Sequence, residues 1–377
     1  MKAESLRKRI LRDLNEQGFK INKGIIYCNE DIKKEKIRSL HSKAKHIKLE
    51  ENKQFISENK DTLIDYFAEG EDINPAKFSP IIHQVESDSL YSNLFRFSTL
   101  MWSVPVSQGY GRRTRFLVFD ESINKLVGLF ALCDPVFNMR VRDQWIGWNQ
   151  NQRREKLYNV MDVFILGAVP PYNRLLCGKF IALAATSNIV RKSIWKKYKG
   201  SSSIIMKKKK DPHLVLLTTT SALGRSSLYN RLSTNNGIYF RKLGFTEGWG
   251  HFHLNNNTFL KMRRYLEERN HPVAKSYKYG GGPNWRFRVS RICLEQIGLS
   301  NNLLRHGIKR EFYAVPLAEN FREYLLGKSH RPKYYNVKFD NLVEFFKDRW
   351  MIPRAERCPD YKRLGKETVL KYILGDN

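Results

Sequence analysis

The spacing of apolar residues predicts that the chain begins with helices. Leu6, Ile10, Leu11 and Leu14 recur at intervals of three and four residues, which is the repeat of one helix face. Residues 30–61 are charged and rich in lysine, as is typical of a solvated helix or of an arm that binds nucleic acid. We therefore expect a helical region over about the first 75 residues.

Apolar runs in the middle of the chain predict a sheet. RTRFLVFD and KLVGLFAL, at 113–120 and 125–132, flank a turn and have the pattern of a β-hairpin. A strand, a helix and another strand are then expected at 162–169, 175–187 and 213–217. The pattern next predicts a helix at 226–232 and strands at 238–245 and 248–254. This order is typical of an α/β layer whose sheet is partly parallel.

The last part of the chain is basic and aromatic. YKYGGGPNWRFR at 277–288 predicts a glycine-rich loop, and NLVEFFKDRW at 341–350 predicts a helix. We therefore divide the chain into a helical N-terminal region at 1–80, an α/β core at 81–265 and a basic C-terminal domain at 266–377. The expected fold class is mixed α/β, with a mixed sheet and flanking helices.

The charge balance adds a polyanionic partner to this picture. The chain carries 67 Lys and Arg against 37 Asp and Glu, a net charge of +30. An excess of this size attracts nucleic acid through the release of counterions, and an anionic membrane surface is the competing partner. Because no long amphipathic helix has a consistent basic face, we expect nucleic acid, most simply DNA, and no membrane.

Cysteine usage and hydropathy predict a cytoplasmic protein. The five cysteines are odd in number and form no C-x-x-C pair, so neither a disulfide framework nor a structural zinc site is expected. No segment approaches the ~20 apolar residues of a membrane span. The charged N-terminus differs from the apolar core of a signal peptide.

The order of elements from the hairpin onwards resembles the GNAT acetyltransferase fold. In that family a strand leads into a helix through a loop whose backbone amides hold the coenzyme A pyrophosphate. The matching segment is VPPYNRLLCGKF, in which Arg174 takes the first place of the motif. Cys177 and Lys179 stand where the motif has glycine and a small residue. The resemblance therefore implies a GNAT-like core at 81–265 without acetyl-CoA as a cofactor.

Longer strings resemble the DruA family, a component of the bacterial Druantia antiphage system. They are DPVFNMRVRDQWIGW, LGAVPPYNRLLCGK, TTTSALGRSSLYNRL joined to KLGFTEGWGHFHL, and NWRFRVSRICLEQIGLSNNLLRHGIKREFYAVPLAEN. The resemblance covers most of the chain. It implies a role in defence against phage, action on nucleic acid and a very large helicase-like partner.

Hydroxyl, arginine and tyrosine side chains follow the apolar run at 213–217. Arg225 and Tyr229 are four residues apart, so on the expected helix they share a face. An arginine lowers the pKa of a neighbouring phenol and binds phosphate, which makes Tyr229 a candidate nucleophile for a phosphodiester, with Arg225 and Arg231 as phosphate ligands. The alternative interpretation is a core tyrosine, with Ser226 as a helix N-cap.

The segment RDQWIGWNQNQRREKLYN interleaves basic and aromatic residues. Trp145 and Trp148 are candidate platforms for unpaired bases, and packing inside the fold is the alternative interpretation. Interleaved basic residues suit a single strand, which offers phosphates and exposed base faces together. The candidate phosphate ligands, here and elsewhere in the chain, are Arg142, Arg153, Arg154, Lys179, Arg286 and Arg288.

Acid–base candidates complete the predicted site. His251 and His253 alternate on the expected strand at 248–254 and therefore face the same side. With Asp143 they are candidate ligands of a divalent metal such as Mg²⁺, or candidate general bases. The pair also resembles the HUH pattern of relaxases, although the order of elements differs from that family. A pair of half-buried sheet residues is the alternative.

These patterns lead to one hypothesis and two alternatives. The hypothesis is recognition of single-stranded or branched DNA, with strand cleavage or joining through Tyr229 and acid–base help from Asp143 and His251 or His253. The first alternative is a non-catalytic DNA-binding adaptor that recruits or loads a helicase. The second is an acyltransferase that uses coenzyme A. The sequence leaves open the metal requirement, the oligomeric state and the choice between DNA and RNA.

Overall fold

The chain folds into two compact units, each assembled from separated segments. The computed structural model describes residues 2–22, 24–27, 33–107, 109–202, 209, 211–230, 232–235, 237–251, 253–275 and 283–374. Unit 1 comprises residues 1–47, 221–225 and 245–311, and unit 2 comprises residues 48–220, 226–244 and 312–377. Each unit therefore takes residues from all three consecutive regions into which the sequence was divided.

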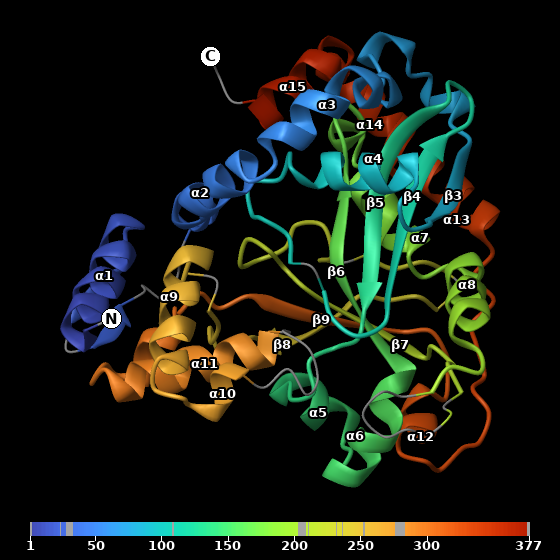
Figure 1. Cartoon of the computed structure of the whole chain (residues 1–377). Helices are drawn as coiled ribbons and strands as arrows, with labels where there is room; N and C mark the ends of the chain where they lie inside the picture. Colours follow the sequence, from blue (N-terminus) through green and yellow to red (C-terminus); the bar gives the residue numbers. More distant parts are fainter. Residues whose placement is uncertain are drawn as a thin grey trace. The chain divides into compact units, whose positions relative to one another are not determined.

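A seven-stranded mixed sheet forms the centre of unit 2 (Figure 1). In spatial order its strands are β3 Pro80–Val85, β4 Arg113–Asp120, β5 Lys125–Cys133, β6 Val160–Ala168, β7 Leu216–Thr220, β9 Glu311–Pro316 and β8 Arg241–Phe245. Neighbours from β3 to β6 are antiparallel, as are β7 and β9, whereas β6 and β7 are parallel. The predicted mixed α/β class, its hairpin and its partly parallel sheet are confirmed.

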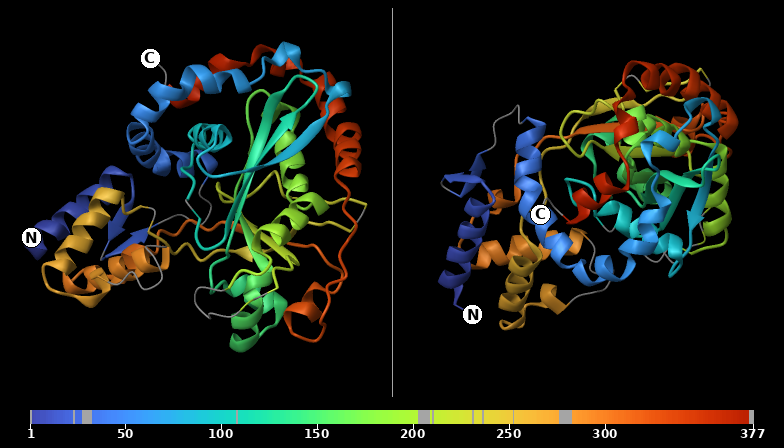
Figure 2. Two further views of the ribbon diagram at one scale, coloured as in Figure 1. Left: turned by 45° about the vertical axis from the view of Figure 1, so that its right-hand side comes forward. Right: turned by 90° about the horizontal axis from the view of Figure 1, so that it is seen from above.

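Helices cover both faces of this sheet because the central strands are apolar on both sides. Along β4, Phe116 and Val118 belong to the same apolar cluster as Phe180 of α7, and Leu117 belongs with Leu94 of α4. Figure 2 shows the strands with helices on both sides. The helices of unit 2 are α3 Lys53–Leu63, α4 Leu90–Thr99, α5 Arg140–Ile146, α6 Gln150–Lys156, α7 Cys177–Ala184, α8 Asn188–Tyr198, α12 Phe321–Leu325, α13 Phe339–Phe346, α14 Ile352–Arg357 and α15 Lys366–Leu374.

Unit 1 is mainly helical. Its elements are α1 Ala3–Glu16, β1 Lys20–Asn22, β2 Ile25–Tyr27, most of α2 Lys34–Glu50, α9 Asn256–Glu267, α10 Pro272–Lys275 and α11 Pro283–Gln296. Leu6, Ile10 and Leu14 lie on one face of α1 and share an apolar core with Met262 and Leu266 of α9. The predicted helical N-terminus is confirmed, with the short β1–β2 hairpin as an addition.

A buried polar contact joins the end of α1 to the beginning of α9. Asn255 is the N-cap of α9, and its side chain accepts a hydrogen bond from the Thr258 backbone N–H at 2.8 Å. The Asp13 carboxylate of α1 accepts hydrogen bonds from the Thr258 hydroxyl and, at 3.3 Å, from the Asn255 amide. The helix cap and the α1 carboxylate therefore satisfy one another inside the core.

Three local predictions are corrected by the structure. The strand expected at 213–217 is β7 at Leu216–Thr220, so three of the threonines lie inside the strand. The described part of 226–232 contains bends and a turn where a helix was expected. The described part of 248–254 contains an isolated bridge at Trp249 where a strand was expected. The loop at 277–282 and Phe252 lie outside the described residues.

Hydrogen bonds outside regular elements hold the two segments in which a helix and a strand were expected. The Phe240 backbone N–H donates to Leu232 O at 2.9 Å and closes a local loop, whereas the Gly250 N–H donates to Leu304 O at 3.0 Å in a distant part of the sequence. In the second case the tertiary contact overrides the local propensity.

Candidate functional site

Asp143 is the centre of a saturated hydrogen-bond network in unit 2. Its Oδ1 accepts from Arg142 Nε at 2.8 Å and from Trp148 Nε1 at 3.0 Å. Its Oδ2 accepts from the Met139 backbone N–H at 3.0 Å and from an Arg153 guanidinium nitrogen at 2.9 Å. Four donors occupy the carboxylate, so this geometry favours a structural anion over a general base.

The partner of Asp143 is a fully buried arginine. The Arg142 side chain is 0% exposed, and its remaining donors reach Val136 O at 2.8 Å and Phe137 O at 2.9 Å. Burial lowers the pKa of this guanidinium, while the adjacent Asp143 opposes that shift. The ion pair therefore fixes the backbone ahead of α5, and the guanidinium offers no exposed surface to a phosphate.

The two predicted stacking tryptophans pack within the fold. Trp148 is buried and donates to Asp143. The ring of Trp145 stacks on that of Phe321 with the centroids 5.0 Å apart and the planes 21° apart, and the Arg322 guanidinium lies 5.5 Å from its centroid. Trp145 remains half-buried. The packing interpretation accounts for both side chains.

Tyr229 is also a packed residue. Its ring stacks on Phe240 with a centroid separation of 5.5 Å and an angle of 3°, and it lies 5.2 Å from the Tyr313 ring. Its hydroxyl accepts a hydrogen bond from the Thr219 hydroxyl at 3.5 Å. Burial raises the pKa of Tyr229 to about 12, with a further contribution from the charge of Asp162. A phenol of higher pKa is the reverse of an activated nucleophile.

The helix that was expected to place Arg225 beside Tyr229 is absent from the described part of 226–232. Arg225 belongs to unit 1 and Tyr229 to unit 2, and the intervening residues are bends, so the i, i+4 relationship of a helix is absent between them. Ser226 does cap this turn, because its hydroxyl accepts from the Leu228 and Tyr229 backbone N–H groups at 3.1 and 3.0 Å. Arg231 lies outside the described residues.

The other predicted phosphate ligands differ in exposure. Arg154, Arg225 and Arg288 have exposed side chains. Lys179 Nζ donates to Leu228 O at 3.1 Å, so this lysine also serves the turn before Tyr229. The Arg286 guanidinium lies 4.3 Å from the centroid of the Phe259 ring and is partly buried.

In unit 1, His253 is buried beside His306, and His251 is half-buried. A ring nitrogen of His253 lies 2.6 Å from Leu303 O, and the His253 and His306 rings meet edge to face with centroids 5.7 Å apart. Burial lowers the pKa of His251 and of His253 to about 4. Both rings are therefore neutral at physiological pH. They lie in a different unit from Asp143 and Tyr229, so neither unit alone contains the predicted catalytic set.

A partly buried carboxyl that the sequence pattern did not single out lies where β6 meets β7. Asp162 is paired in register with Thr218, whose hydroxyl donates to the carboxylate at 2.7 Å. The strands are paired only over Val160–Asp162 and Leu216–Thr218. The next threonine, Thr219, continues the contact through its hydroxyl, which donates to Val163 O at 2.9 Å. The threonine hydroxyls thus join the two parallel strands.

The Asp162 carboxyl is the main perturbed acid of unit 2. Burial raises its pKa to about 6, and this shift is opposed by the Thr218 hydrogen bond and by the charge of Arg142. Burial, with the Asp162 charge as a second cause, raises the pKa of Tyr110 and of Cys133. A carboxyl with a pKa near 6 has the property of a general acid or base. Its signal in the sequence is a lone aspartate at the head of the apolar run DVFILGAV.

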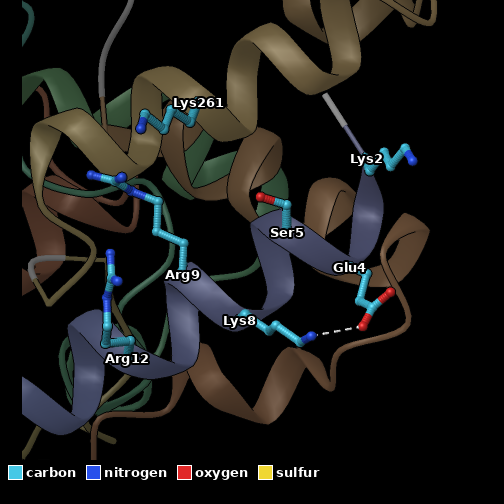
Figure 3. Close-up of a pocket in the computed structure, with 7 residues that line it drawn as sticks. All are labelled: Lys2, Glu4, Ser5, Lys8, Arg9, Arg12 and Lys261. Atoms are coloured by element: carbon cyan, nitrogen blue, oxygen red, sulfur yellow. Dashed lines mark ion pairs between the residues drawn. The ribbon is translucent and has the colours of Figure 1, made fainter.

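An open depression lies beside α1 in unit 1 (Figure 3). It is lined by Lys2, Glu4, Ser5, Lys8, Arg9, Arg12 and Lys261. Lys8 pairs with Glu4 at 2.9 Å, and the Arg9 and Arg12 guanidinium groups lie 4.0 and 3.7 Å from Asp13 and Glu16. The cations of α1 are therefore largely balanced by carboxylates one turn away.

Two further findings concern metals and membranes. Among the described residues, no group of three or more His, Cys, Asp or Glu side chains is arranged to hold a metal ion. In the same part of the chain, no helix combines the length and the apolar character that a bilayer crossing requires.

Comparison with known proteins gives two matches along the sequence. The family model described as Druantia protein DruA matches residues 31–327. The Druantia protein DruA of Escherichia coli (strain UMEA 4076-1) is 40% identical over 379 residues, which span 100% of this chain and 94% of that protein. No solved structure matches the chain. The likeness of the core to the GNAT fold therefore stays a prediction.

We expect Asp143→Ala to destabilise the fold. Removing the carboxylate leaves the buried Arg142 charge unpaired, which costs about 3 kcal/mol of unfolding free energy. Chemical denaturation of the full chain, followed by tryptophan fluorescence, measures the loss of unfolding free energy. Glu121→Ala is the matched control, because Glu121 is an exposed carboxylate whose removal changes stability by less than about 0.5 kcal/mol. Equal stability of the two variants would contradict the structural role of Asp143.

We expect acid to loosen unit 1 before unit 2. Burial lowers the pKa of His41, His251 and His253 to about 4 and that of His306 to about 2. Below pH 6.5 the unfolded histidines take up protons that the folded ones do not, so stability falls as the pH falls from about 6.5 towards 4. Asp162 acts in the opposite direction in unit 2, because its folded pKa is raised.

Amide hydrogen exchange at pH 7 and pH 5, corrected for intrinsic rates, measures this difference. Protection should fall in α9 and α11 and persist in β4 to β6. A uniform loss of protection across both units would contradict the prediction.

Proposed function

We propose that this chain, which belongs to the Druantia protein DruA family of antiphage defence, binds nucleic acid in that role. The observation that carries the proposal is the net charge of +30. Like charges in such an excess repel one another, and this repulsion lowers the stability of the fold. A bound polyanion reduces the repulsion and releases its own counterions.

The excess charge is present in both units. Unit 1 holds 26 Lys and Arg against 11 Asp and Glu, an excess of 15, and the remaining 41 against 26 in unit 2 give the other 15. Unit 1 is much the shorter of the two, so its charge density is higher. Both units therefore favour an extended polyanion over a small anionic ligand.

The geometry favours recognition over cleavage through Tyr229. A strand-cleaving tyrosine needs a hydroxyl that reaches a phosphate and a pKa close to or below its usual range. The Tyr229 hydroxyl is buried against Thr219 and its pKa is raised. We infer a DNA-binding adaptor that presents nucleic acid to a helicase-like partner, with any strand chemistry in that partner.

We expect the purified protein to bind DNA with a strong dependence on salt. Fluorescence anisotropy with single-stranded, duplex and forked DNA and with RNA measures the affinity. Because phosphate contacts release counterions, the affinity should fall at least about tenfold between 50 and 200 mM salt. A peptide nucleic acid of the same sequence has no backbone charge and is the control that should not bind. Lack of binding to all four nucleic acids at 50 mM salt would contradict the proposed function.

We expect Tyr229→Phe to retain DNA binding. The substitution removes a hydroxyl with one long hydrogen bond and keeps the ring stacked on Phe240, so stability should change by less than about 1 kcal/mol. Anisotropy measures the binding, and a denaturing gel of end-labelled single-stranded and forked DNA with Mg²⁺ shows whether strands are cut or joined. Tyr239→Phe, which alters an exposed tyrosine, is the matched control. Shorter or joined strands that vanish in Tyr229→Phe alone would establish the catalytic alternative.

A further inference from the structure

The crossover between β6 and β7 contains no acidic residue before Asp211. From Val163 to Lys210 the chain holds eleven Lys and Arg and no Asp or Glu, a run bounded by Asp162 and Asp211. Within the chain's general excess, this is a continuous stretch in which no local carboxylate balances the positive charge. It contains α7, which is buried in the core, and α8, which follows it.

The inner face of α8 is fixed against unit 2. Val190 and Ile194 are fully buried in the main apolar cluster. The hydroxyl of Tyr198 and the Nζ of Lys197 donate to Arg113 O of β4 at 2.7 and 2.8 Å. These contacts determine the rotation of α8 about its axis, and therefore which side chains lie on its outward face.

That opposite face consists of three lysines and a tryptophan. Trp195 and Lys196 follow Lys192 by three and four residues and share its side of α8. Lys199, the C-cap residue of the helix, extends this stripe through its contact with Trp195. All four are exposed. Lys199 Nζ lies 4.5 Å from the centroid of the Trp195 ring. The stripe thus alternates point charges with one flat apolar surface.

The charges of this stripe differ from those of α1. On α1, cations have carboxylates one turn away, as in Lys8 and Glu4. Lys192, Lys196 and Lys199 form no ion pair with any residue that the structure describes. Arg115 and Arg113 lie close enough to Lys197 to lower its pKa further, after the effect of burial. Such crowding of like charges opposes folding, which is expected where a site serves binding.

We propose that the outward face of α8, formed by Lys192, Trp195, Lys196 and Lys199, binds single-stranded nucleic acid. The lysines contact successive phosphates, and Trp195 stacks on an unpaired base. This inference rests on the proposed function and adds to it a surface and a strand preference.

The chemistry of the stripe favours a single strand over the other polyanions. A duplex keeps its bases stacked inside, so it offers Trp195 nothing to stack on. A membrane-surface helix inserts a continuous apolar face into lipid, but Val190 and Ile194 of α8 are already packed in the core. A single strand can contact both the lysines, through its phosphates, and Trp195, through an unpaired base.

Two sets of variants of the full chain test the inference by anisotropy. Trp195→Ala should weaken binding of a single strand about 5- to 100-fold and change binding of a duplex less than about threefold, because only unpaired bases lose a stacking partner. Trp195→Phe keeps an aromatic face and should restore most of the affinity. The triple variant Lys192→Gln, Lys196→Gln, Lys199→Gln should lower the salt slope on a single strand by about 2.

The matched control removes the same charge elsewhere. Arg7→Gln, Lys8→Gln, Arg12→Gln alters three exposed cations of α1, two of which have carboxylates one turn away, and should leave the salt slope within about 0.5 of wild type. Thermal unfolding of each variant, compared with wild type, shows that the altered exposed side chains leave the fold intact.

The outcomes separate this inference from the function on which it rests. If wild type binds single strands but the α8 variants bind as well as wild type, or no worse than the α1 control, the α8 surface is overturned and the proposed function stands. If wild type binds no nucleic acid, or binds only vesicles of anionic lipid, both are overturned. Selective loss in the α8 variants supports both.

Discussion

The parallel pairing of β6 with β7 is the constraint from which the rest of unit 2 follows. Parallel neighbours cannot be joined by a tight turn, so the chain has to cross over one face of the sheet before β7 begins. That crossover supplies α7 and α8, and the buried side chains of both helices belong to the main apolar cluster. The strand pair itself is short and is completed by side chains, with Thr218 bound to Asp162 and Thr219 to Val163. A few hydroxyl contacts therefore hold the crossover in place.

Polar groups in this protein separate into an internal and an external set. The internal set comprises the Asp143–Arg142 pair, Asp162 and the buried histidines, each held by specific partners. The external set has more cations than anions, and on α8 its lysines have few partners. Buried pairs give a unique packing, whereas unpaired surface charge gives long-range attraction. The first set shapes the molecule, and the second is suited to meet a polyanion.

The sequence was informative where structure depends on local pattern. The apolar runs RTRFLVFD and KLVGLFAL predicted β4 and β5, because strands buried on both faces are apolar throughout. For Tyr229 the sequence left two interpretations open, a nucleophile and a core tyrosine, and the fold decides for the core tyrosine by bringing Phe240 and Tyr313 against its ring. The excess of lysine was visible, but the stripe on α8 needs the fold to decide which side faces outward.

The assembly of unit 1 from separated segments has a consequence for synthesis. Asp13 of α1 and Thr258 of α9 are 245 residues apart, yet they hydrogen-bond inside one core. During translation α1 emerges early with its apolar face uncovered, and its partners α9 and α11 follow only after the sheet strands of unit 2 up to β8 have been made. Such non-local closure is slow and leaves apolar surface exposed in the meantime. The apolar face of α1 therefore remains without its native partners until most of the chain has been synthesised.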